Sequence, residues 1–135
     1  MTAPFHWPVR VYWEDTDAGG VVYYANYLKF MERARSEWLR ALGFEQDELR
    51  NAFGVVFVVR RVEIDYVSPA RFNEEITVDV SVHEVGRASL SVNQTLARGT
   101  TRLALAQVTL ACVDASRFKP VKIPAPILHL LKPDP

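Results

Sequence analysis

The chain has a single long stretch with helical spacing, and almost everything after it has the two-residue spacing of β-strands. Apolar residues recur at three- and four-residue steps from Tyr27 to Leu42, which predicts one amphipathic helix. Asn26 is the expected N-cap of this helix, and Gly43 stands where a C′ glycine would end it. Any sheet formed by the rest of the chain must therefore cover its apolar face with this one helix.

The remaining segments predict a five-stranded sheet. Short connections marked by Ser68-Pro69, Gly86 and Gly99 separate the strands after the helix, and such connections require antiparallel pairing. Strands are expected over 9–13, 55–67, 76–83, 88–96 and 103–113, with shorter helices over 46–51 and 127–131. The predicted fold class is α+β, a helix wrapped by a curved antiparallel sheet, with residues 1–135 forming a single domain.

The charge balance limits the kinds of partner that the protein is expected to bind, and the cysteine content indicates the cellular compartment. The 16 basic and 16 acidic residues cancel, which argues against nucleic acid or an anionic membrane as the main partner. No stretch approaches the ~20 apolar residues of a membrane span, so no integral membrane contact is expected. Cys112 is the only cysteine and forms no internal disulfide, which favours a cytoplasmic protein.

Several familiar catalytic patterns are missing from the sequence. It has no G-x-S-x-G elbow, no P-loop and no dinucleotide-binding glycine fingerprint. The histidines His6, His83 and His129 lie far apart and lack the spacing of metal ligands, so no metal is expected. If the protein is an enzyme, its working group is expected to be a carboxylate.

Three acids directly precede the helix: Glu14, Asp15 and Asp17. Glu14 and Asp15 have structural alternatives, as a hydrogen-bond acceptor and as a turn former. Asp17 precedes Gly19-Gly20, where missing side chains let a ligand approach the main chain. A carboxylate beside the unpaired N–H groups of a helix start is the minimum equipment for acyl transfer.

The segment 11–39 (VYWEDTDAGGVVYYANYLKFMERARSEWL) resembles the hotdog-fold acyl-CoA thioesterases of the 4-hydroxybenzoyl-CoA thioesterase type. Within that family it is most similar to the YbgC branch, which is associated with the Tol-Pal system. The D-x-D-x-x-G-x-V-Y core carries the resemblance most specifically. Weaker similarity continues through 57–60, 65–70 and 112–114, so it covers nearly the whole chain.

The resemblance implies a hotdog fold, dimers whose sheets join edge to edge, and active sites at the subunit interface. Such dimers commonly pair into homotetramers. By position, Asp17 matches the family's catalytic aspartate, and the backbone N–H of Tyr24 matches the donor that polarises the thioester carbonyl. Relatives in the YbgC branch often carry histidine at the position of Tyr24, so any role of a histidine side chain is absent here.

The implied substrate is an acyl thioester of coenzyme A or of acyl carrier protein, with coenzyme A as part of the substrate and no separate cofactor. Gly20 and Val21, next to Asp17, are candidate substrate-binding residues. Relatives contact the nucleotide near the turn that holds Arg87 and Ser89, and Arg60 is a further candidate for the phosphates.

Three functions stay open on the sequence. The first is acyl-CoA hydrolysis with Asp17 as general base or nucleophile. The second is a hotdog dehydratase acting on acyl thioesters, although such enzymes usually pair a histidine with an acid. The third is a non-catalytic acyl-CoA-binding or scaffold protein. The length and kind of acyl group are not readable from the sequence.

Overall fold

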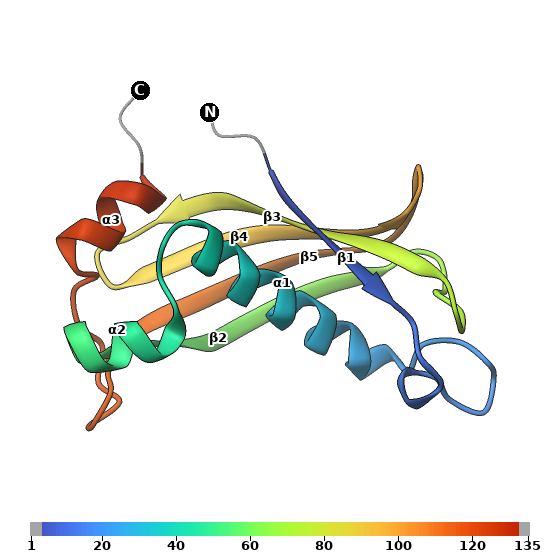
Figure 1. The fold of residues 1–135 in the computed structure, drawn as a ribbon, viewed down its shortest axis with the longest axis horizontal. Coiled ribbons are helices and arrows are strands. Elements are labelled where there is room, and N and C mark those ends of the chain that lie inside the picture. The colour runs from blue at the N-terminus through green and yellow to red at the C-terminus, as the bar shows by residue number, and fades with distance from the viewer. Residues whose placement is uncertain (1–3, 133–135) are drawn as a thin grey trace.

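In the computed structural model, which describes residues 4–132, a curved antiparallel sheet wraps around the long helix α1 (Figure 1). The strand order across the sheet is β1-β3-β4-β5-β2, which leaves β1 and β2 at the two edges. This arrangement confirms the predicted α+β hotdog architecture. The elements are β1 (Phe5–Arg10), α1 (Tyr27–Ala41), α2 (Gln46–Phe53), β2 (Val55–Tyr66), β3 (Glu75–Val85), β4 (Ser89–Arg98), β5 (Thr101–Asp114) and α3 (Ala125–Leu131).

The end of α1 follows the prediction from Gly43. The N–H of Gly43 donates to the carbonyl of Arg40 at 3.0 Å, and the N–H of Phe44 donates to that of Leu39 at 2.9 Å. Gly43 has a φ of +102°, a conformation that favours glycine. These paired bonds form a Schellman motif, which satisfies the last carbonyls of the helix.

The first strand lies earlier than the sequence predicts. The prediction of a strand over 9–13 is wrong, because β1 spans Phe5–Arg10 and Trp13–Asp15 form a 3₁₀ turn. Pro8, which cannot donate a ladder hydrogen bond, is tolerated within β1 because β1 is an edge strand and, among the described residues, pairs with β3 alone. The strand cannot continue to Trp13 because the N–H of Tyr12 donates to the Asp15 carboxylate at 2.8 Å.

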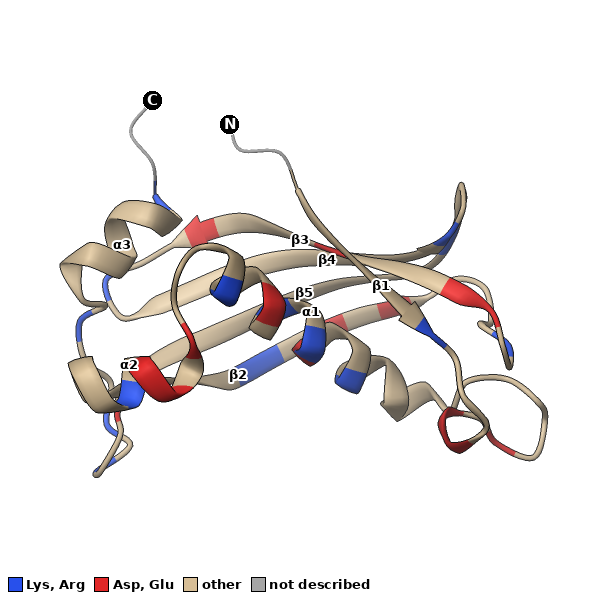
Figure 2. Ribbon diagram, viewed as in Figure 1, with Lys and Arg blue, Asp and Glu red and all other residues tan. Residues whose placement is uncertain are grey.

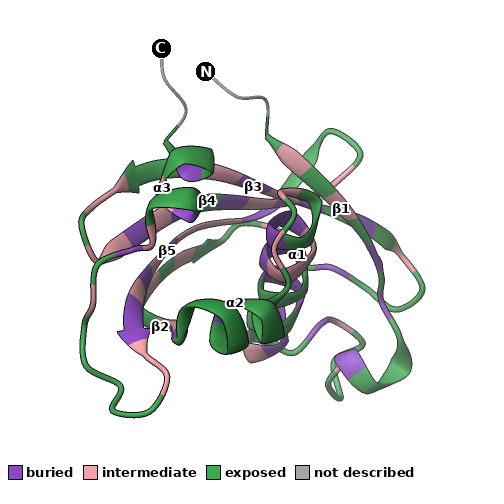
Figure 3. Cartoon of the chain, turned by 60° about the vertical axis from the view of Figure 1, so that its left-hand side comes forward, coloured by how far each residue is buried: buried purple, intermediate pink, exposed green. Residues whose placement is uncertain are grey.

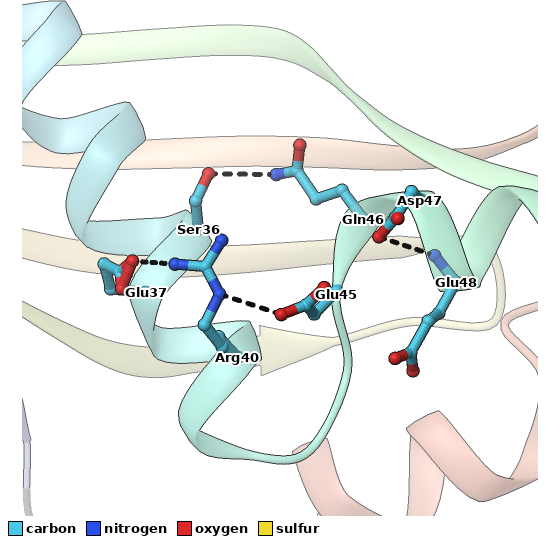
Figure 4. A network of polar contacts seen from close by, with 7 residues as sticks. All are labelled: Ser36, Glu37, Arg40, Glu45, Gln46, Asp47 and Glu48. Atoms are coloured by element: carbon cyan, nitrogen blue, oxygen red, sulfur yellow. Dashed lines mark hydrogen bonds and ion pairs between the residues drawn. The ribbon is translucent and has the colours of Figure 1, made fainter.

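Polar contacts hold α1 against α2 at the turn between them (Figure 4). Arg40 lies between two carboxylates, pairing with Glu37 on its own helix and with Glu45 at 3.3 Å. Gln46 donates to the Ser36 hydroxyl at 3.1 Å. Since all of these groups are at the surface, the network positions α2 without contributing much stability.

The core lies between α1 and the inner face of the sheet (Figure 3). One polar pair interrupts it. Arg35 of α1 is only 9% exposed, although the sequence places its charge off the apolar stripe. Its guanidinium donates to the fully buried Gln94 of β4 at 3.0 Å, and Gln94 donates to the carbonyl of Met31 at 3.1 Å. Burial lowers the pKa of Arg35, and nearby Glu32 partly opposes that shift.

The outer face of the sheet is polar but nearly uncharged along β4 and β5. The charged residues of β4 and β5 lie only at strand ends, at Arg98, Arg102 and Asp114, and these strands are mostly tan in Figure 2. Among the described residues, no helix is both long and apolar enough to cross a membrane.

Edge strand β2 carries a bulge. Val59 pairs with Leu110 and Arg61 pairs with Thr109, so Arg60 is the extra residue. Val59 shares the inner face with Leu110, yet its side chain remains 49% exposed. The inner face of the sheet is therefore incompletely covered at the β2 edge.

Candidate active site

Asp17 lies in an exposed loop whose backbone is tightly hydrogen-bonded. Its N–H donates to the carbonyl of Val21 at 2.9 Å, and its own carbonyl accepts from Gly20 at 3.0 Å. The carboxylate accepts the N–H of Gly19 at 2.8 Å. Gly20 has a φ of +80°, which explains a glycine there. The loop therefore fixes the backbone of Asp17 and leaves its carboxylate open to solvent.

Asn26 occupies the N-cap position of α1, as the sequence predicts, but without the usual capping bond. A 3₁₀ turn, Tyr24–Asn26, precedes the helix, and Asn26 has helical φ and ψ. Its side chain donates to Asp15 and makes no capping hydrogen bond. Among residues 4–132, no acceptor pairs with the backbone N–H of Tyr24. This N–H is thus a free donor at the positive end of the helix.

Tyr66, at the end of β2, holds the backbone of Tyr24 from the other side. The Tyr66 hydroxyl donates to the carbonyl of Tyr24 at 2.8 Å, and its ring meets Tyr27 edge-on with centroids 5.2 Å apart. Burial, and then the neighbours Tyr27 and Tyr24, raise the pKa of Tyr66. Its hydroxyl therefore stays protonated at neutral pH and remains a donor.

Asp15 and Asn26 form a buried pair between the Asp17 loop and the helix start. Each is 7% exposed, and the Asn26 amide donates to the Asp15 carboxylate at 2.7 Å. The carbonyl of Asp15 also accepts the N–H of Tyr23 at 2.9 Å. Of the three competing acids, Asp15 is thus engaged in the fold, while Glu14 and Asp17 are exposed.

Gly20 and Val21 lie beside Asp17, as the sequence predicts. Backbone contacts hold Val21 and the residue after it in place. Val21 forms a bridge with Arg71, and the N–H of Val22 donates to the carbonyl of Ala70 at 2.8 Å. These contacts bring the loop against the segment that follows β2.

The other predicted substrate residues lie elsewhere. Arg60 and Ser89 line one hollow of about 320 Å³ on the outer face of the sheet, together with Arg61. The bulge explains why the consecutive residues Arg60 and Arg61 both reach this hollow. Arg87 is exposed in the turn just before Ser89.

These residues are far from Asp17 within one chain. Ser89 begins β4, whereas the Tyr66 end of β2 that contacts Tyr24 aligns with the opposite end of β4, near Leu96. Seven residues of strand separate the two positions, which is roughly 23 Å. A single chain therefore does not place Ser89 or Arg87 next to Asp17.

The described residues contain no group of three or more histidine, cysteine or acidic side chains placed to hold a metal ion. The junction between this loop and the helix presents the exposed carboxylate of Asp17 and the free N–H of Tyr24.

Several known proteins are similar to this chain in sequence and in fold. Residues 11–131 match the family described as the thioesterase-like superfamily. The acyl-CoA thioesterase YbgC of Haemophilus influenzae is 47% identical over 131 residues, which cover 95% of this chain and 96% of the relative. The acyl-CoA thioester hydrolase YbgC of Escherichia coli O6:H1 is 43% identical over 132 residues, covering 97% and 98%.

A probable thioesterase from Bartonella henselae shares the fold, with a TM-score of 0.86 and 35% identity, covering 90% of this chain and all (100%) of that one. The chain therefore belongs to the thioesterase-like superfamily, in the branch of YbgC-type acyl-CoA thioesterases.

Proposed function

We propose that this chain hydrolyses acyl-CoA thioesters to a free acid and coenzyme A, with the carboxylate of Asp17 doing the chemistry. The observation that carries the proposal is the junction described above, where an exposed carboxylate and an unpaired backbone N–H flank the start of α1. The names of the relatives from Haemophilus influenzae and Escherichia coli support the same substrate class.

In the proposed mechanism, the thioester oxygen binds the N–H of Tyr24, where negative charge develops in the transition state. Donors of this kind contribute about 3–4 kcal/mol to other acyl-transfer enzymes. Asp17 either removes a proton from a water that attacks the carbonyl carbon, or attacks that carbon itself. In both routes the C–S bond breaks and coenzyme A leaves as a thiolate. The second route passes through a mixed anhydride that water then hydrolyses.

The remaining predicted residues have binding roles in this proposal. Gly20 and Val21 form the wall beside the thioester, since they lie next to Asp17. Arg60, Arg87 and Ser89 contact the phosphates of coenzyme A, whose negative charge suits arginine. The substrate is carried by coenzyme A or by acyl carrier protein, and the proposed location is the cytoplasm.

The purified protein should release free thiol from acyl-CoA. A panel of aliphatic and aromatic acyl-CoAs, followed with a thiol reagent, measures this directly and reads out the preferred acyl group. Coenzyme A binding without thiol release would overturn the hydrolase and favour a binding or scaffold protein. Loss of water from a 3-hydroxyacyl thioester with the thioester intact would favour the dehydratase instead.

We also propose that the working unit is a homo-oligomer joined through β2. This strand pairs with β5 on one side, and no described strand pairs with its other side. Val59 lies on the inner face beside this edge and is half exposed. Antiparallel pairing of two β2 edges would bring the Ser89 end of one chain next to the Asp17 end of the other, which supplies the separated substrate residues.

Sedimentation at micromolar concentration should therefore give a mass of two or four chains, where one chain weighs 15.3 kDa. Because an edge-to-edge dimer hides β2, its amides should also exchange hydrogen more slowly than those of edge strand β1. A stable, active monomer would contradict the proposed interface.

A further inference from the structure

The buried side chains of Asp15 and Asn26 are hydrogen-bonded to each other, and the Asp15 carboxylate also accepts a main-chain N–H. All of the hydrogen-bonding groups of Asp15 are used: its N–H donates to the carbonyl of Tyr12 at 3.0 Å, and its carbonyl accepts from Tyr23 at 2.9 Å. One carboxylate oxygen accepts the N–H of Tyr12 at 2.8 Å, and the other accepts the Asn26 amide at 2.7 Å. No ion pair of the described residues includes Asp15.

These bonds bracket Tyr24. Tyr23 and Asn26 lie on either side of it, and both donate to Asp15, one through its main chain and one through its side chain. The position of the Tyr24 N–H relative to Asp15 is therefore set from both directions.

Asp15 also precedes Asp17 by two residues in the same loop. Thr16, between the two acids, forms a bridge with Val22, and the N–H of Asp17 donates to the carbonyl of Val21. Asp15 thus stands at the point where the backbone that carries Asp17 and the backbone that carries Tyr24 are joined.

The chemistry of the pair fits this role better than that of a helix cap. An asparagine before a helix ordinarily caps it by accepting a main-chain N–H, yet the side chain of Asn26 is turned to Asp15 and makes no such bond. A buried carboxylate is also costly unless its hydrogen bonds are complete. A shorter apolar pair would fill the space but would not fix a distance between two backbone segments.

We propose that Asp15 and Asn26 form a positioning strut that sets the distance between the Asp17 carboxylate and the Tyr24 N–H. The effect of this strut on catalysis assumes the proposed function, which is thioester hydrolysis at Asp17. Asp15 and Asn26 do not touch the reacting atoms in this scheme. Their effect is on kcat, because a misplaced donor or carboxylate fails in the transition state even when the substrate still binds.

Single substitutions should break the strut in opposite ways. In Asp15→Asn, two donors, the Tyr12 N–H and the Asn26 amide, face one carbonyl oxygen and one amino group. In Asn26→Asp, two carboxylates face each other. Each change is expected to lower kcat about tenfold or more, with KM changed less than about twofold. Asn26→Ala, which introduces no charge, keeps the test available if either variant folds poorly.

The double variant Asp15→Asn/Asn26→Asp should restore the strut with reversed polarity. The new amide at position 15 accepts the Tyr12 N–H and donates to the new carboxylate at position 26. Its kcat should return to within about threefold of the parent. A merely structural role would lower kcat only in proportion to the folded fraction measured by circular dichroism.

Asp79→Asn is the matched control. The Asp79 carboxylate also accepts a main-chain N–H group, from Thr95 at 2.7 Å. Asp79 lies in β3, which β4 and β5 separate from the β2 edge. This variant is expected to change the melting temperature but to leave kcat within about twofold.

A second readout does not depend on catalysis. The Tyr23 amide, bonded to Asp15, should lose protection from hydrogen exchange in the single variants and regain it in the double variant. Unchanged kcat in Asn26→Ala, or a well-folded double variant no faster than the singles, would overturn the strut. If the parent protein releases no thiol at all, the proposed function fails, and the exchange pattern alone decides whether the strut exists.

Discussion

Asp17→Asn should lower kcat for acyl-CoA hydrolysis by at least about 100-fold, the lower end of what a positioned general base contributes. The substitution is nearly isosteric, and its amide oxygen still accepts the Gly19 N–H that the carboxylate accepts at 2.8 Å. The loop should therefore keep its shape. The lower kcat would then result from the lost negative charge and basicity of the carboxylate. Initial rates of thiol release at saturating acyl-CoA measure the effect.

Glu14→Gln is the control for this prediction. Glu14 is an exposed acid three residues away, and the structure gives it no role in holding the loop. Its variant should retain the parental kcat within about twofold. Near-normal turnover in Asp17→Asn, with the fold intact, would remove Asp17 from the mechanism and leave the hydrolase without a catalytic group.

Phe30→Ala should lower the free energy of unfolding by about 3–5 kcal/mol, the range measured when large aromatic residues are removed from packed cores. Phe30 is 0% exposed in α1, and its ring meets that of Tyr27 edge-on with centroids 6.4 Å apart. Truncation leaves a cavity beneath α1, the long helix that the sheet wraps. Urea unfolding at a fixed protein concentration measures the loss, because association would otherwise shift the midpoint.

Phe53→Ala provides the matched comparison for this core substitution. Phe53 lies in α2, where its side chain is 37% exposed and packs edge-on against Phe44. Its removal should cost only about 1 kcal/mol. Equal losses in the two variants would show that Phe30 is not packed as the structure describes.

Periodicity predicts most of the fold because apolar spacing reflects burial. The spacing from Tyr27 to Leu42 locates α1, and Gly43 marks its end because only a residue tolerant of positive φ fits there. Alternation also finds four of the five strands to within a few residues. The first strand is misplaced because the alternation from Val9 to Trp13 reveals neither the 3₁₀ turn at Trp13–Asp15 nor the pairing of Phe5–Arg10 with β3.

Polar residues in buried positions are the main failure of sequence reasoning. Arg35 looks like part of the charged face of the helix, and Gln94 looks like a break in the alternation of β4, yet they lie together in the core. Arg35 and Gln94 are 59 positions apart, so the pattern of neither segment reveals this contact. Asn26 is predicted correctly as the N-cap residue, but its side-chain bond to Asp15 is missed because Asp15 lies in a different segment.

Only the part of the candidate site that lies in one short segment can be predicted from the sequence. Asp17, Gly20, Val21 and Tyr24 fall within eight consecutive positions, so their proximity follows from the sequence. Whether Arg60, Arg87 and Ser89 share a site with Asp17 depends on strand register, on a bulge and on the β2 edge. None of these is encoded in the spacing of a single segment.

The charges along β2 have a consequence for how the protein avoids aggregation. A 12-residue edge strand with open hydrogen-bonding groups is a template on which other chains could stack without limit. The apolar run at its start gives way to two basic residues, Arg60 and Arg61, and then to two acidic residues, Glu63 and Asp65. Growth in an arbitrary register would bring like charges together, so the same residues that permit one ordered pairing also act as gatekeepers against fibre formation.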